Sequence, residues 1–541
     1  MILRHKINND KTADVPAKKI DANVKKKSKV LRQGETCWRL AHADRMAVII
    51  DAADYFVHLK TAILQARHSI FLVGWDFDVR IELDRTGRTS NSIPNRVGQL
   101  LDHAIRLNPS LRVYVLRWDL AFLKVPLRGT TPFFLLDWLG GDRLHFHLDQ
   151  RHPPGGCHHQ KIVVIDDSIA FCGGIDVTDG RWDTPDHHDD EPLRRSANGT
   201  LQGPWHDVTT AVDGQAAQAL GDLARARWFA ANDWQPEAPP KCPSCWPESL
   251  APTFKEVQVA IARTSPAYGD QPAVQEIEAL YLAAIASARR SIYLESQYFS
   301  AHRISEALAA RLSESDGPEV VIINPKHAQG WLEEKVMGTA RVLLLEQLKK
   351  ADHSGRLRFC TPVTAGGEDI YVHAKVLVVD DTLLRVGSSN INNRSMGLDT
   401  ECDLAVEAPQ DNPSGTALRS GILRVRNTLL AEHLGVRREE FEATLQATNG
   451  SLIMALDRLM HAHGHRLEHF EPPVLSDVDR RLAQSHALDP HRPEAMAESF
   501  VRALQQIAPL RTKSVVALIV AGGLAFAWHW IRMHRRNWPK R

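Results

Sequence analysis

The hydrophobic pattern of the chain alternates between amphipathic helical segments and short apolar runs. Residues 62–72 (AILQARHSIFL) and 284–294 (AIASARRSIYL) each read as the end of an amphipathic helix that leads into an apolar strand. The runs KIVVID, ending at Asp166, and KVLVVD, ending at Asp380, are typical of strands buried in a sheet that is covered on both faces. Helices that alternate with buried strands predict an α/β fold.

The same pattern occurs twice, which indicates an internal duplication. Segments 62–72 and 284–294 align without a gap, and RLHFHL at 143–148 pairs with RLRFCT at 356–361. A His-x-Lys-x4-Asp motif follows in each copy. Its residues and the next glycine have the same offsets in both copies: His159, Lys161, Asp166 and Gly173 in the first, and His373, Lys375, Asp380 and Gly387 in the second.

Each copy also carries a carboxylate after its motif. Aligning the strands that follow the motifs places Asp207 opposite Glu401. From motif histidine to carboxylate is 48 residues in the first copy and 28 in the second, so the first copy contains an insertion of 20. This insertion, at about 180–200, is rich in His, Asp and Pro and reads as a loop. His187 and His188 lie in it and are expected to face solvent.

The duplication and the local composition divide the chain into six segments. We predict two homologous fused α/β halves packed as a pseudo-dimer, followed by a helical C-terminal region and a single apolar anchor helix. The predicted boundaries are a disordered basic arm at 1–34, the first half at 35–234, a Pro-rich linker at 235–253, the second half at 254–408, the helical region at 409–510, and the anchor helix at 514–531.

The net charge and the length of one apolar segment favour a membrane over nucleic acid as the partner of this chain. The 541 residues carry a net charge of +1, whereas nucleic-acid-binding domains are usually strongly basic. The arm, with its excess of Lys and Arg, reads as a solubilising tail or as a weak attraction to anionic lipid headgroups. Residues 514–531 contain no charge and approach the minimum length of a transmembrane helix. We expect single-pass or anchored membrane attachment, with the catalytic region cytoplasmic because no apolar signal sequence follows the basic start.

Two groups of residues offer alternative metal sites. The seven cysteines are spread thinly, which favours a reduced compartment over a disulfide framework. Cys242 and Cys245 form a lone CxxC without a second ligand pair, so a zinc or redox role is the weaker interpretation. The local density of histidine offers a rival zinc site at His145, His147, His152, Cys157 and His158. Its spacing follows strand and loop rather than a metal-binding pattern, so we predict no metal and no cofactor.

The repeated motifs carry the candidate chemistry. Side chains two residues apart in an extended segment share a face, so each motif histidine projects together with its lysine. Asp166 and Asp380, five residues after the lysines, are expected to be structural anchors. The carboxylates nearest the imidazoles must come from other strands, and Asp207 and Glu401 are the pair that the repeat offers.

Two histidines oriented by carboxylates can divide the work of cleaving a phosphodiester. One imidazole attacks and the other protonates the leaving group. Lys161 and Lys375 place positive charge where a phosphate would bind, and Ser389 and Asn390 add neutral donors. The predicted catalytic set is therefore His159, Lys161, His373, Lys375, Asp207 and Glu401. This set can proceed through a phosphohistidine without a metal, because the lysines supply the charge stabilisation.

These residues resemble the phospholipase D superfamily, whose paired His-x-Lys-x4-Asp motifs are followed by Gly-Gly or Gly-Ser and an Asn. The resemblance covers roughly residues 35–410 and rests on HHQKIVVIDDSIAFCGGIDVTDGRWDTP, PWHDV, ESQYF and VHAKVLVVDDTLLRVGSSNINNRSMGLDTE. It implies one active site between two fused halves, a phosphohistidine intermediate, His159 as nucleophile and His373 as acid. One position departs from the pattern, since Asp176 stands where the second half has Asn390.

The resemblance implies a membrane-attached phospholipase D that hydrolyses a glycerophospholipid to phosphatidic acid and a free headgroup, with transphosphatidylation left open. The alternative is a phosphatidyltransferase of the cardiolipin synthase type. The expected partners are a glycerophospholipid substrate, a water or alcohol acceptor and a membrane, and no nucleic acid is expected. A nuclease and a catalytically dead lipid-binding scaffold are weaker alternatives, while the headgroup and the oligomeric state are left open.

Overall fold

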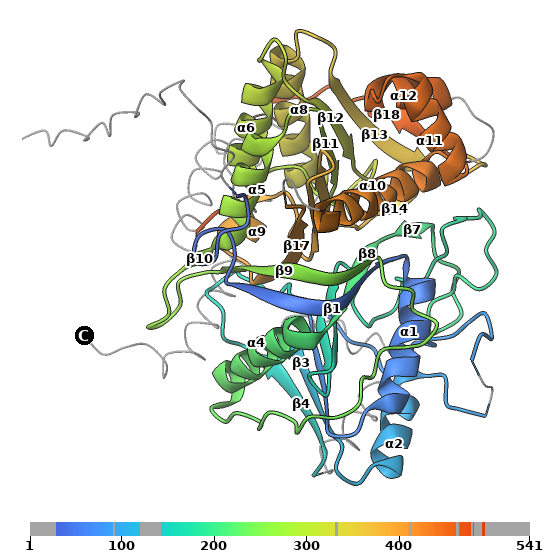
Figure 1. The fold of residues 1–541 in the computed structure, drawn as a ribbon, viewed down its shortest axis with the longest axis vertical. Helices are drawn as coiled ribbons and strands as arrows, with labels where there is room; N and C mark the ends of the chain where they lie inside the picture. Colours follow the sequence, from blue (N-terminus) through green and yellow to red (C-terminus); the bar gives the residue numbers. More distant parts are fainter. Residues whose placement is uncertain are drawn as a thin grey trace, which may run out of the picture.

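The computed structural model describes residues 29–89, 92–119, 142–329, 334–409, 413–460, 465–477, 480 and 489–492. The predicted anchor at 514–531 and residues 1–28 of the predicted basic arm lie outside this range. Within it, no helix combines the length and the apolar character that crossing a bilayer requires. Figure 1 shows the second half above the first, with β9 and β1 side by side at their boundary.

A single 16-stranded sheet runs through both halves. The first half contributes β1 (Arg39–Ile50), β2 (Ser69–Gly74), β3 (Arg112–Trp118), β4 (Leu144–Asp149), β5 (Ile162–Ile165), β6 (Ile169–Gly173) and β8 (Val208–Asp213). The rest of the chain contributes β9 (Phe254–Ser265), β10 (Val274–Gln275), β11 (Ser291–Glu295), β12 (Glu319–Ile323), β13 (Leu357–Val363), β15 (Val376–Val379), β16 (Leu383–Gly387), β17 (Glu401–Glu407) and β18 (Arg466–His469).

The strand order is the same when it is read inward from either edge. It runs β4-β3-β2-β5-β6-β8-β1 from one side and β13-β12-β11-β15-β16-β17-β9 from the other, with β18 added outside β13. The two central strands pair antiparallel, from Arg39 opposite Ile261 to Met46 opposite Phe254. The predicted mixed α/β fold is confirmed, and the two copies of the motif occupy equivalent places in one continuous sheet.

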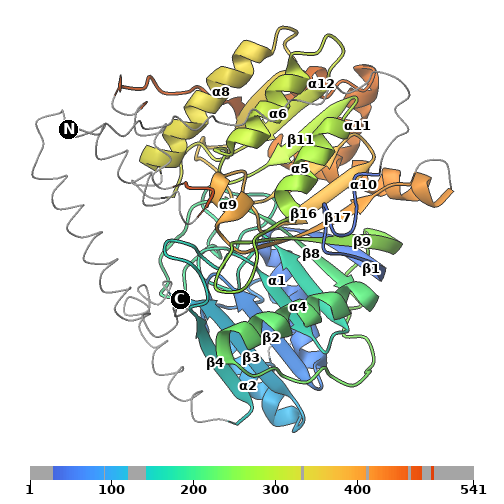
Figure 2. The same cartoon turned by 90° about the vertical axis from the view of Figure 1, so that its left-hand side faces the viewer.

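Helices cover both faces of this sheet (Figure 2). Those before the linker are α1 (Ala52–Gln65), α2 (Val97–Leu107) and α4 (Gly214–Asn232). Those after it are α5 (Glu276–Ser287), α6 (His302–Leu312), α8 (Thr339–Ala351, continuing the π-helix Glu334–Gly338), α9 (Asn393–Gly397), α10 (Pro413–His433), α11 (Arg438–Ala447) and α12 (Leu452–Leu459). The cluster formed by α4 with α10, α11 and α12 spans both halves, so the C-terminal helices share the core of the catalytic region.

The two motif aspartates lie in the turns after β5 and β15 and have positive φ values of 53° and 54°. The Asp166 carboxylate accepts hydrogen bonds from the backbone N–H groups of residues 67–69 at 2.7–2.8 Å. Asp380 does the same for residues 289–291 at 2.8–3.0 Å. Each carboxylate thereby ties the end of its motif strand to the start of the neighbouring strand, because it satisfies N–H groups that the sheet leaves open.

Three sequence-based expectations need correction. Val30 and Leu31 are buried and donate backbone hydrogen bonds to the Glu407 carboxylate at 2.9 Å, so the folded part begins inside the predicted arm. The region predicted to be helical after residue 409 also contains the strand β18, which buries Leu467 against β13. His187 was expected to face solvent but is only 1% exposed, because the insertion folds back under α10, whereas His188 is exposed.

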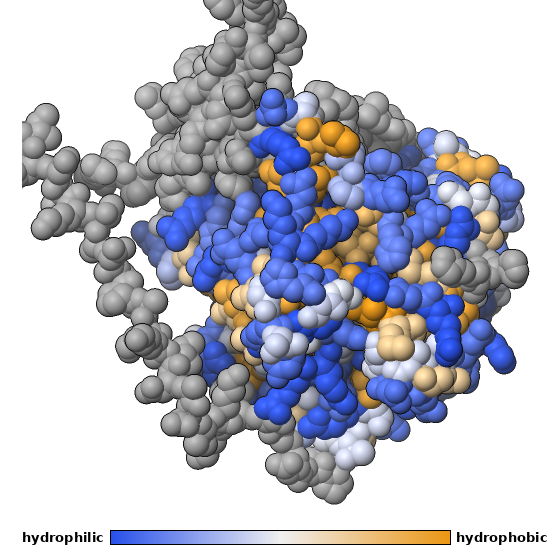
Figure 3. All heavy atoms as spheres, turned by 90° about the horizontal axis from the view of Figure 1, so that it is seen from above, coloured by the Kyte–Doolittle hydropathy of each residue, from blue (hydrophilic) through white to orange (hydrophobic). Residues whose placement is uncertain are grey.

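The described surface offers no single large apolar face. The large apolar side chains exposed in this part of the chain are scattered over different segments: Leu107, Leu193, Leu201, Phe229, Trp234, Met454 and Val474. On the face shown in Figure 3, polar residues predominate and apolar residues form small separate groups. Such scattered exposure is ordinary for a folded protein and marks no docking surface.

Candidate active site

The two motif histidines lie just before their strands, because β5 begins at Ile162 and β15 at Val376. Their backbones are held by the opposite half of the molecule. The N–H of His159 donates to the carbonyl of Thr400 at 3.0 Å, and the N–H of His373 donates to that of His206 at 2.8 Å. The acceptor residues directly precede Glu401 and Asp207, so each histidine lies beside the carboxylate of the other half.

These crossing contacts form two short parallel pairings between the halves. On one side, β7 (Trp205–His206) pairs with β14 (Tyr371–Val372). On the other side, His158 and Thr400 form an isolated parallel bridge. Both pairings are short and largely buried. Each places a motif histidine beside a segment that lies about 170 to 240 residues away in the chain.

The imidazoles bind the carboxylates crosswise. The Nδ1 atom of His159 lies 3.0 and 3.1 Å from the two Glu401 oxygens, and Nδ1 of His373 lies 2.7 Å from Oδ2 of Asp207. A carboxylate that accepts from Nδ1–H fixes the tautomer and leaves a lone pair on Nε2. Both histidines line one cavity of about 400 Å³. The arrangement therefore presents two oriented imidazoles to a shared space.

Burial and neighbouring cations set the protonation of this group. Burial, Lys161 and Lys375 lower the pKa of His159 well below its ordinary value, and burial, Lys375 and Arg181 do the same for His373. Burial raises the pKa of Glu401 to about 7 and that of Asp207 to about 6. Burial thus disfavours the charged forms of all four groups.

The motif lysines lie behind the histidines. The Nζ atom of Lys161 donates to the carbonyl of His159 at 3.1 Å and lies 3.2 Å from Oδ2 of Asp176, while that of Lys375 donates to the carbonyl of His373. The two lysines are 4% and 0% exposed and do not form part of the cavity wall. Asp176, the position that departs from the second half, thus serves as a counter-ion of Lys161 at the edge of the cavity.

The two carboxylates are supported differently. Glu401 accepts hydrogen bonds from the Ser388 hydroxyl at 2.5 Å and from the Ser395 hydroxyl at 2.7 Å. Asp207 accepts one from the backbone N–H of Val208 at 2.8 Å. Gly174 occupies the place equivalent to Ser388, and a Cβ atom there would lie 2.0 Å from Oδ1 of Asp207. The shorter aspartate fits only because this position has no side chain.

Replacing Gly174 by alanine is therefore expected to displace Asp207 and to lower kcat/KM by about 10²-fold, the effect of a misplacement near 1 Å. The matched variant Ser388→Ala removes one of several hydrogen bonds to Glu401 and should cost less. Steady-state kinetics compare the two variants, and circular dichroism checks that both remain folded. Unchanged kinetics in a folded Gly174→Ala variant would show that the Asp207 position tolerates the added methyl group.

Like the two lysines, the predicted phosphate-binding residue Ser389 lies outside the cavity wall. The Ser389 hydroxyl donates to Asp403 at 2.7 Å and accepts from Arg385. It is therefore bound by buried side chains and does not line the cavity. In this structure its hydroxyl is therefore not free to act as the predicted phosphate donor, because the buried Arg385–Asp403 pair binds it. Asn390 does line the cavity, with Nδ2 turned toward Oε1 of Gln297 at 3.5 Å.

The cavity also contains residues that the motif spacing could not identify. Arg181, from the insertion, lies with its guanidinium 4.4 Å from the Trp205 ring and lowers the pKa of His373. Gln297 belongs to the ESQYF segment, which the resemblance had already marked. The rings of Trp75 and Trp118 stack at 5.9 Å on the cavity wall. A cation and two aromatic rings beside the histidines suit a ligand with an anionic group and an apolar part.

The two alternative metal sites are not formed. In the described part of the chain, no cluster of potential ligands includes the cysteines of the CxxC or the His145–His158 group. His145 and His147 pack against Trp228, while His158 pairs with Asp149 at 3.1 Å. Burial raises the pKa of Cys242 to about 11 and of Cys245 to about 12, so both thiols stay protonated beside Asp166.

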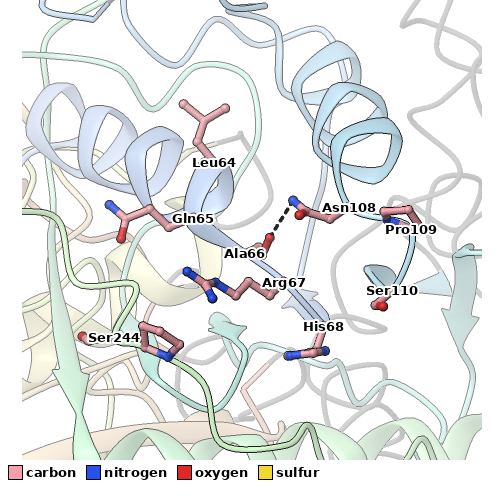
Figure 4. Close-up of a pocket in the computed structure, with 10 residues that line it drawn as sticks. Leu64, Gln65, Ala66, Arg67, His68, Asn108, Pro109, Ser110 and Ser244 are labelled. Carbon is pink, nitrogen blue, oxygen red and sulfur yellow. Dashed lines mark hydrogen bonds between the residues drawn. The ribbon is translucent and has the colours of Figure 1, made fainter.

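A second cavity, of about 540 Å³, opens on the surface of the first half (Figure 4). It lies between the ends of α1 and α2, where Nδ2 of Asn108 donates to the carbonyl of Ala66 at 3.0 Å. Its wall brings together Arg67 and His68 with prolines and serines, and none of the paired motif residues. Size alone does not make it the reactive site, because it lacks convergent catalytic groups.

Comparison with known proteins identifies a family. A model described as "Phospholipase D" matches residues 156–239 and 351–482, and one described as "Cardiolipin synthase, PLD-like domain" matches residues 281–414. Phospholipase D delta of Arabidopsis thaliana is 24% identical over 70% of this chain and 63% of its own length. Phospholipase D alpha 1 of Carica papaya is 25% identical over 74% and 65%. The chain thus spans slightly less than two thirds of the length of these relatives.

A solved structure that this chain matches is the phosphatidylserine synthase of Haemophilus influenzae Rd KW20. It is 13% identical, has a TM-score of 0.48, and the match covers 77% of this chain and 97% of that one. The two matched blocks of the "Phospholipase D" model contain one motif histidine each, together with Asp207 and Glu401. On its sequence matches and on the paired motifs that the fold brings together, the chain belongs to the phospholipase D superfamily.

Proposed function

We propose that the protein is a phosphodiesterase of the phospholipase D type, which cleaves a glycerophospholipid to phosphatidic acid and a free headgroup. The observation that carries this proposal is the crosswise pair of imidazoles, each oriented through Nδ1 by a carboxylate of the other half and each lining the same cavity. The superfamily relatives support a phosphodiester substrate, and two of them, phospholipases D, support a phospholipid.

The proposed reaction has two steps. In the first, Nε2 of His159 attacks phosphorus, the bond from phosphorus to the headgroup oxygen breaks, and Nε2 of His373 gives its proton to that oxygen. In the second, His373 takes a proton from water, the hydroxide attacks phosphorus, and His159 leaves. We assign the attack to His159 because its side chain is more exposed than that of His373, 15% against 6%.

Charge at the site supports this reaction. The two buried lysines contribute positive potential from behind the histidines, where little water screens it. Arg181 and Asn390 lie on the wall and are proposed to contact the phosphate directly, with Lys161 partly neutralised by Asp176. The proposed phosphate-binding set thus shifts from Ser389 toward the cavity wall. No metal is required for these steps, because Arg181 on the wall and the two lysines behind the histidines supply positive charge.

The alternative activity is phosphatidyl transfer of the cardiolipin synthase type. It uses the same first step but takes a lipid alcohol in place of water in the second. The match of residues 281–414 to the cardiolipin synthase model keeps this alternative open. Attachment to a membrane is part of the proposal for either activity and rests on the composition of residues 514–531.

The experiment that tests the proposal presents mixed phospholipid vesicles and a short primary alcohol to the purified chain and resolves the products by mass spectrometry. Phosphatidic acid together with phosphatidyl-alcohol supports a phospholipase D that accepts both water and alcohol. Cardiolipin as the sole lipid product would assign the transferase activity instead. Absence of any lipid turnover would contradict both. The exposed His353→Ala variant is a matched control that should behave as wild type.

The pH dependence should reflect Lys375. Burial lowers its pKa to about 7, so its positive charge is present below pH 7 and is lost as the pH rises through that value. We therefore expect kcat/KM to fall on the alkaline side from about pH 7. Lys375→Arg keeps its charge and should extend activity to higher pH, even if its maximal rate is lower. An identical alkaline limb in both proteins would assign it to another group.

A further inference from the structure

A second group of histidines and carboxylates lies next to the active site and takes no part in the proposed reaction. Asp51 follows β1, His187 comes from the insertion, His206 from β7, and Glu432 from the end of α10. One ligand atom from each lies within 4.8 Å of all the others. All four side chains are at least nine-tenths buried, with exposures of 0% to 5%.

The remaining nitrogen of each imidazole is held by a further buried carboxylate. The Nδ1 atom of His187 lies 3.0 Å from Oδ2 of Asp183, and Nε2 of His206 lies 3.0 Å from Oε2 of Glu295. Carboxylates in this position fix the tautomer, so Nε2 of His187 and Nδ1 of His206 turn their lone pairs toward the centre. Histidines that bind metals are oriented by outer carboxylates in the same way.

Nε2 of His187 forms a hydrogen bond with Oε1 of Glu432 at 3.4 Å, but two other atoms at the centre lack a partner. Oδ2 of Asp51 and Nδ1 of His206 are buried and have no hydrogen-bond partner. Nδ1 of His206 lies only 2.7 Å from Oε1 of Glu432, yet its geometry is not that of a hydrogen bond. Buried carboxylates facing imidazole lone pairs repel each other unless a positive charge lies between them.

Charge compensation from side chains other than the histidines is incomplete. The group contains four buried carboxylates, at Asp51, Asp183, Glu295 and Glu432. Among the described residues, Arg194 is the one cation other than histidine that pairs with them, 3.1 Å from Asp183. A divalent cation at the centre would balance two of these charges and would be bound by two nitrogens and two oxygens.

We propose that Asp51, His187, His206 and Glu432 bind a structural zinc ion, which links helix α10 to the first half. Tetrahedral zinc binds imidazole and carboxylate at about 2.0–2.2 Å, which puts its ligand atoms about 3.3–3.6 Å apart. The separations of 3.4 Å between Nε2 of His187 and Oε1 of Glu432, and of 3.4 and 3.7 Å from Nδ1 of His206 and Nε2 of His187 to the two different oxygens of Asp51, are close to these values. The 2.7 Å between Nδ1 of His206 and Oε1 of Glu432 is shorter, so these two atoms would move apart when the ion binds. With four protein ligands the site is closed, as in structural rather than catalytic zinc sites.

The site is coupled to the active site through the backbone. The N–H of Asp51 donates to the carbonyl of Asp207 at 2.8 Å, and the N–H of Asp207 donates to Oδ1 of Asp51 at 3.1 Å. The carbonyl of His206 accepts the N–H of His373 at 2.8 Å. Zinc bound here would hold the segment that orients His373. This role does not depend on which phosphodiester the protein cleaves.

The test measures metal content and stability rather than activity. Untagged full-length protein is dialysed against metal-free buffer and analysed by inductively coupled plasma mass spectrometry, with an expected content of about one zinc per chain. Removal of the metal with dipicolinate should lower the melting temperature, and zinc, but not magnesium, should restore it. Protein that holds no zinc and whose melting temperature does not respond to added zinc would overturn the proposal and leave a network of protonated histidines.

Variants locate the metal. Glu432→Gln keeps the shape of the side chain but is a poor ligand, so bound zinc should fall at least tenfold while circular dichroism shows a folded protein. The matched control is Glu278→Gln, which also removes a buried carboxylate, 3% exposed and paired with Arg303 outside the cluster, and should keep its zinc. Equal zinc in wild type and Glu432→Gln would place the metal elsewhere and would also overturn the proposal.

Discussion

Replacing His159 or His373 by asparagine is expected to lower phospholipid turnover by about 10⁴-fold or more, the effect of removing a member of a catalytic triad in other enzymes. Each variant keeps a polar side chain of similar reach but loses the nitrogen that attacks phosphorus or carries the proton. The two losses should be about equal, because both imidazoles take part in both steps of the proposed reaction. Initial rates on vesicles, with His353→Ala as the control, measure the effect. Substantial activity in either folded variant would contradict the two-histidine mechanism.

A trapping experiment assigns the roles of the two histidines. A phosphorus–nitrogen bond to histidine is labile in acid, so the reaction is stopped by rapid alkaline denaturation and the digested peptides are weighed by mass spectrometry. We expect a phosphatidyl adduct on the peptide that contains His159. An adduct on the His373 peptide would exchange the roles and keep the mechanism. Turnover without an adduct on either peptide would favour direct attack by water.

Replacing Asp207 by asparagine or Glu401 by glutamine is expected to lower kcat by roughly 10³- to 10⁴-fold, because an amide stabilises the wrong imidazole tautomer. The structure adds a specific expectation about which histidine responds. Glu401→Gln should change the ring nitrogen signals of His159, and Asp207→Asn those of His373. Long-range ¹H–¹⁵N spectra of histidine-labelled protein report both rings.

The matched control for this prediction is Asp403→Asn, a buried carboxylate two residues after Glu401 that pairs with Arg385. It should reduce stability but leave both histidine tautomers unchanged. A response of His373 to Glu401→Gln, with His159 unaffected, would contradict the crosswise pairing. The comparison therefore separates an orienting role of the carboxylates from a general loss of packing.

The local sequence pattern was sufficient to predict the α/β fold, and the repeat was sufficient to group the motif residues of each half. The alignment of 143–148 with 356–361 correctly anticipated equivalent strands, since β4 and β13 occupy equivalent places in the sheet. The alignment also proposed Asp207 and Glu401 as partners of the histidines. It could not determine which carboxylate meets which imidazole, because that depends on the antiparallel contact between β1 and β9, a pairing between segments more than two hundred residues apart.

Residues whose environment is set by distant segments could not be placed from the sequence. The polar insertion containing His187 reads as a solvated loop, and only the approach of Glu432 from α10 explains its burial. Ser389 reads as a phosphate donor until Arg385 and Asp403 are seen to bind its hydroxyl. Composition and spacing describe the local sequence, whereas these contacts depend on how the second half and α10 pack against the first half.

The crosswise pairing also explains what joining two similar halves in one chain makes possible. A symmetric dimer of one such half would carry every substitution on both sides of its interface, so its two histidines would be chemically identical. In the joined chain, Gly174 faces Asp207 while the equivalent Ser388 supports Glu401, and Asp176 stands opposite Asn390 in the repeat. The linker therefore permits asymmetry: two copies of one motif can differ in proton affinity and take different roles in one reaction.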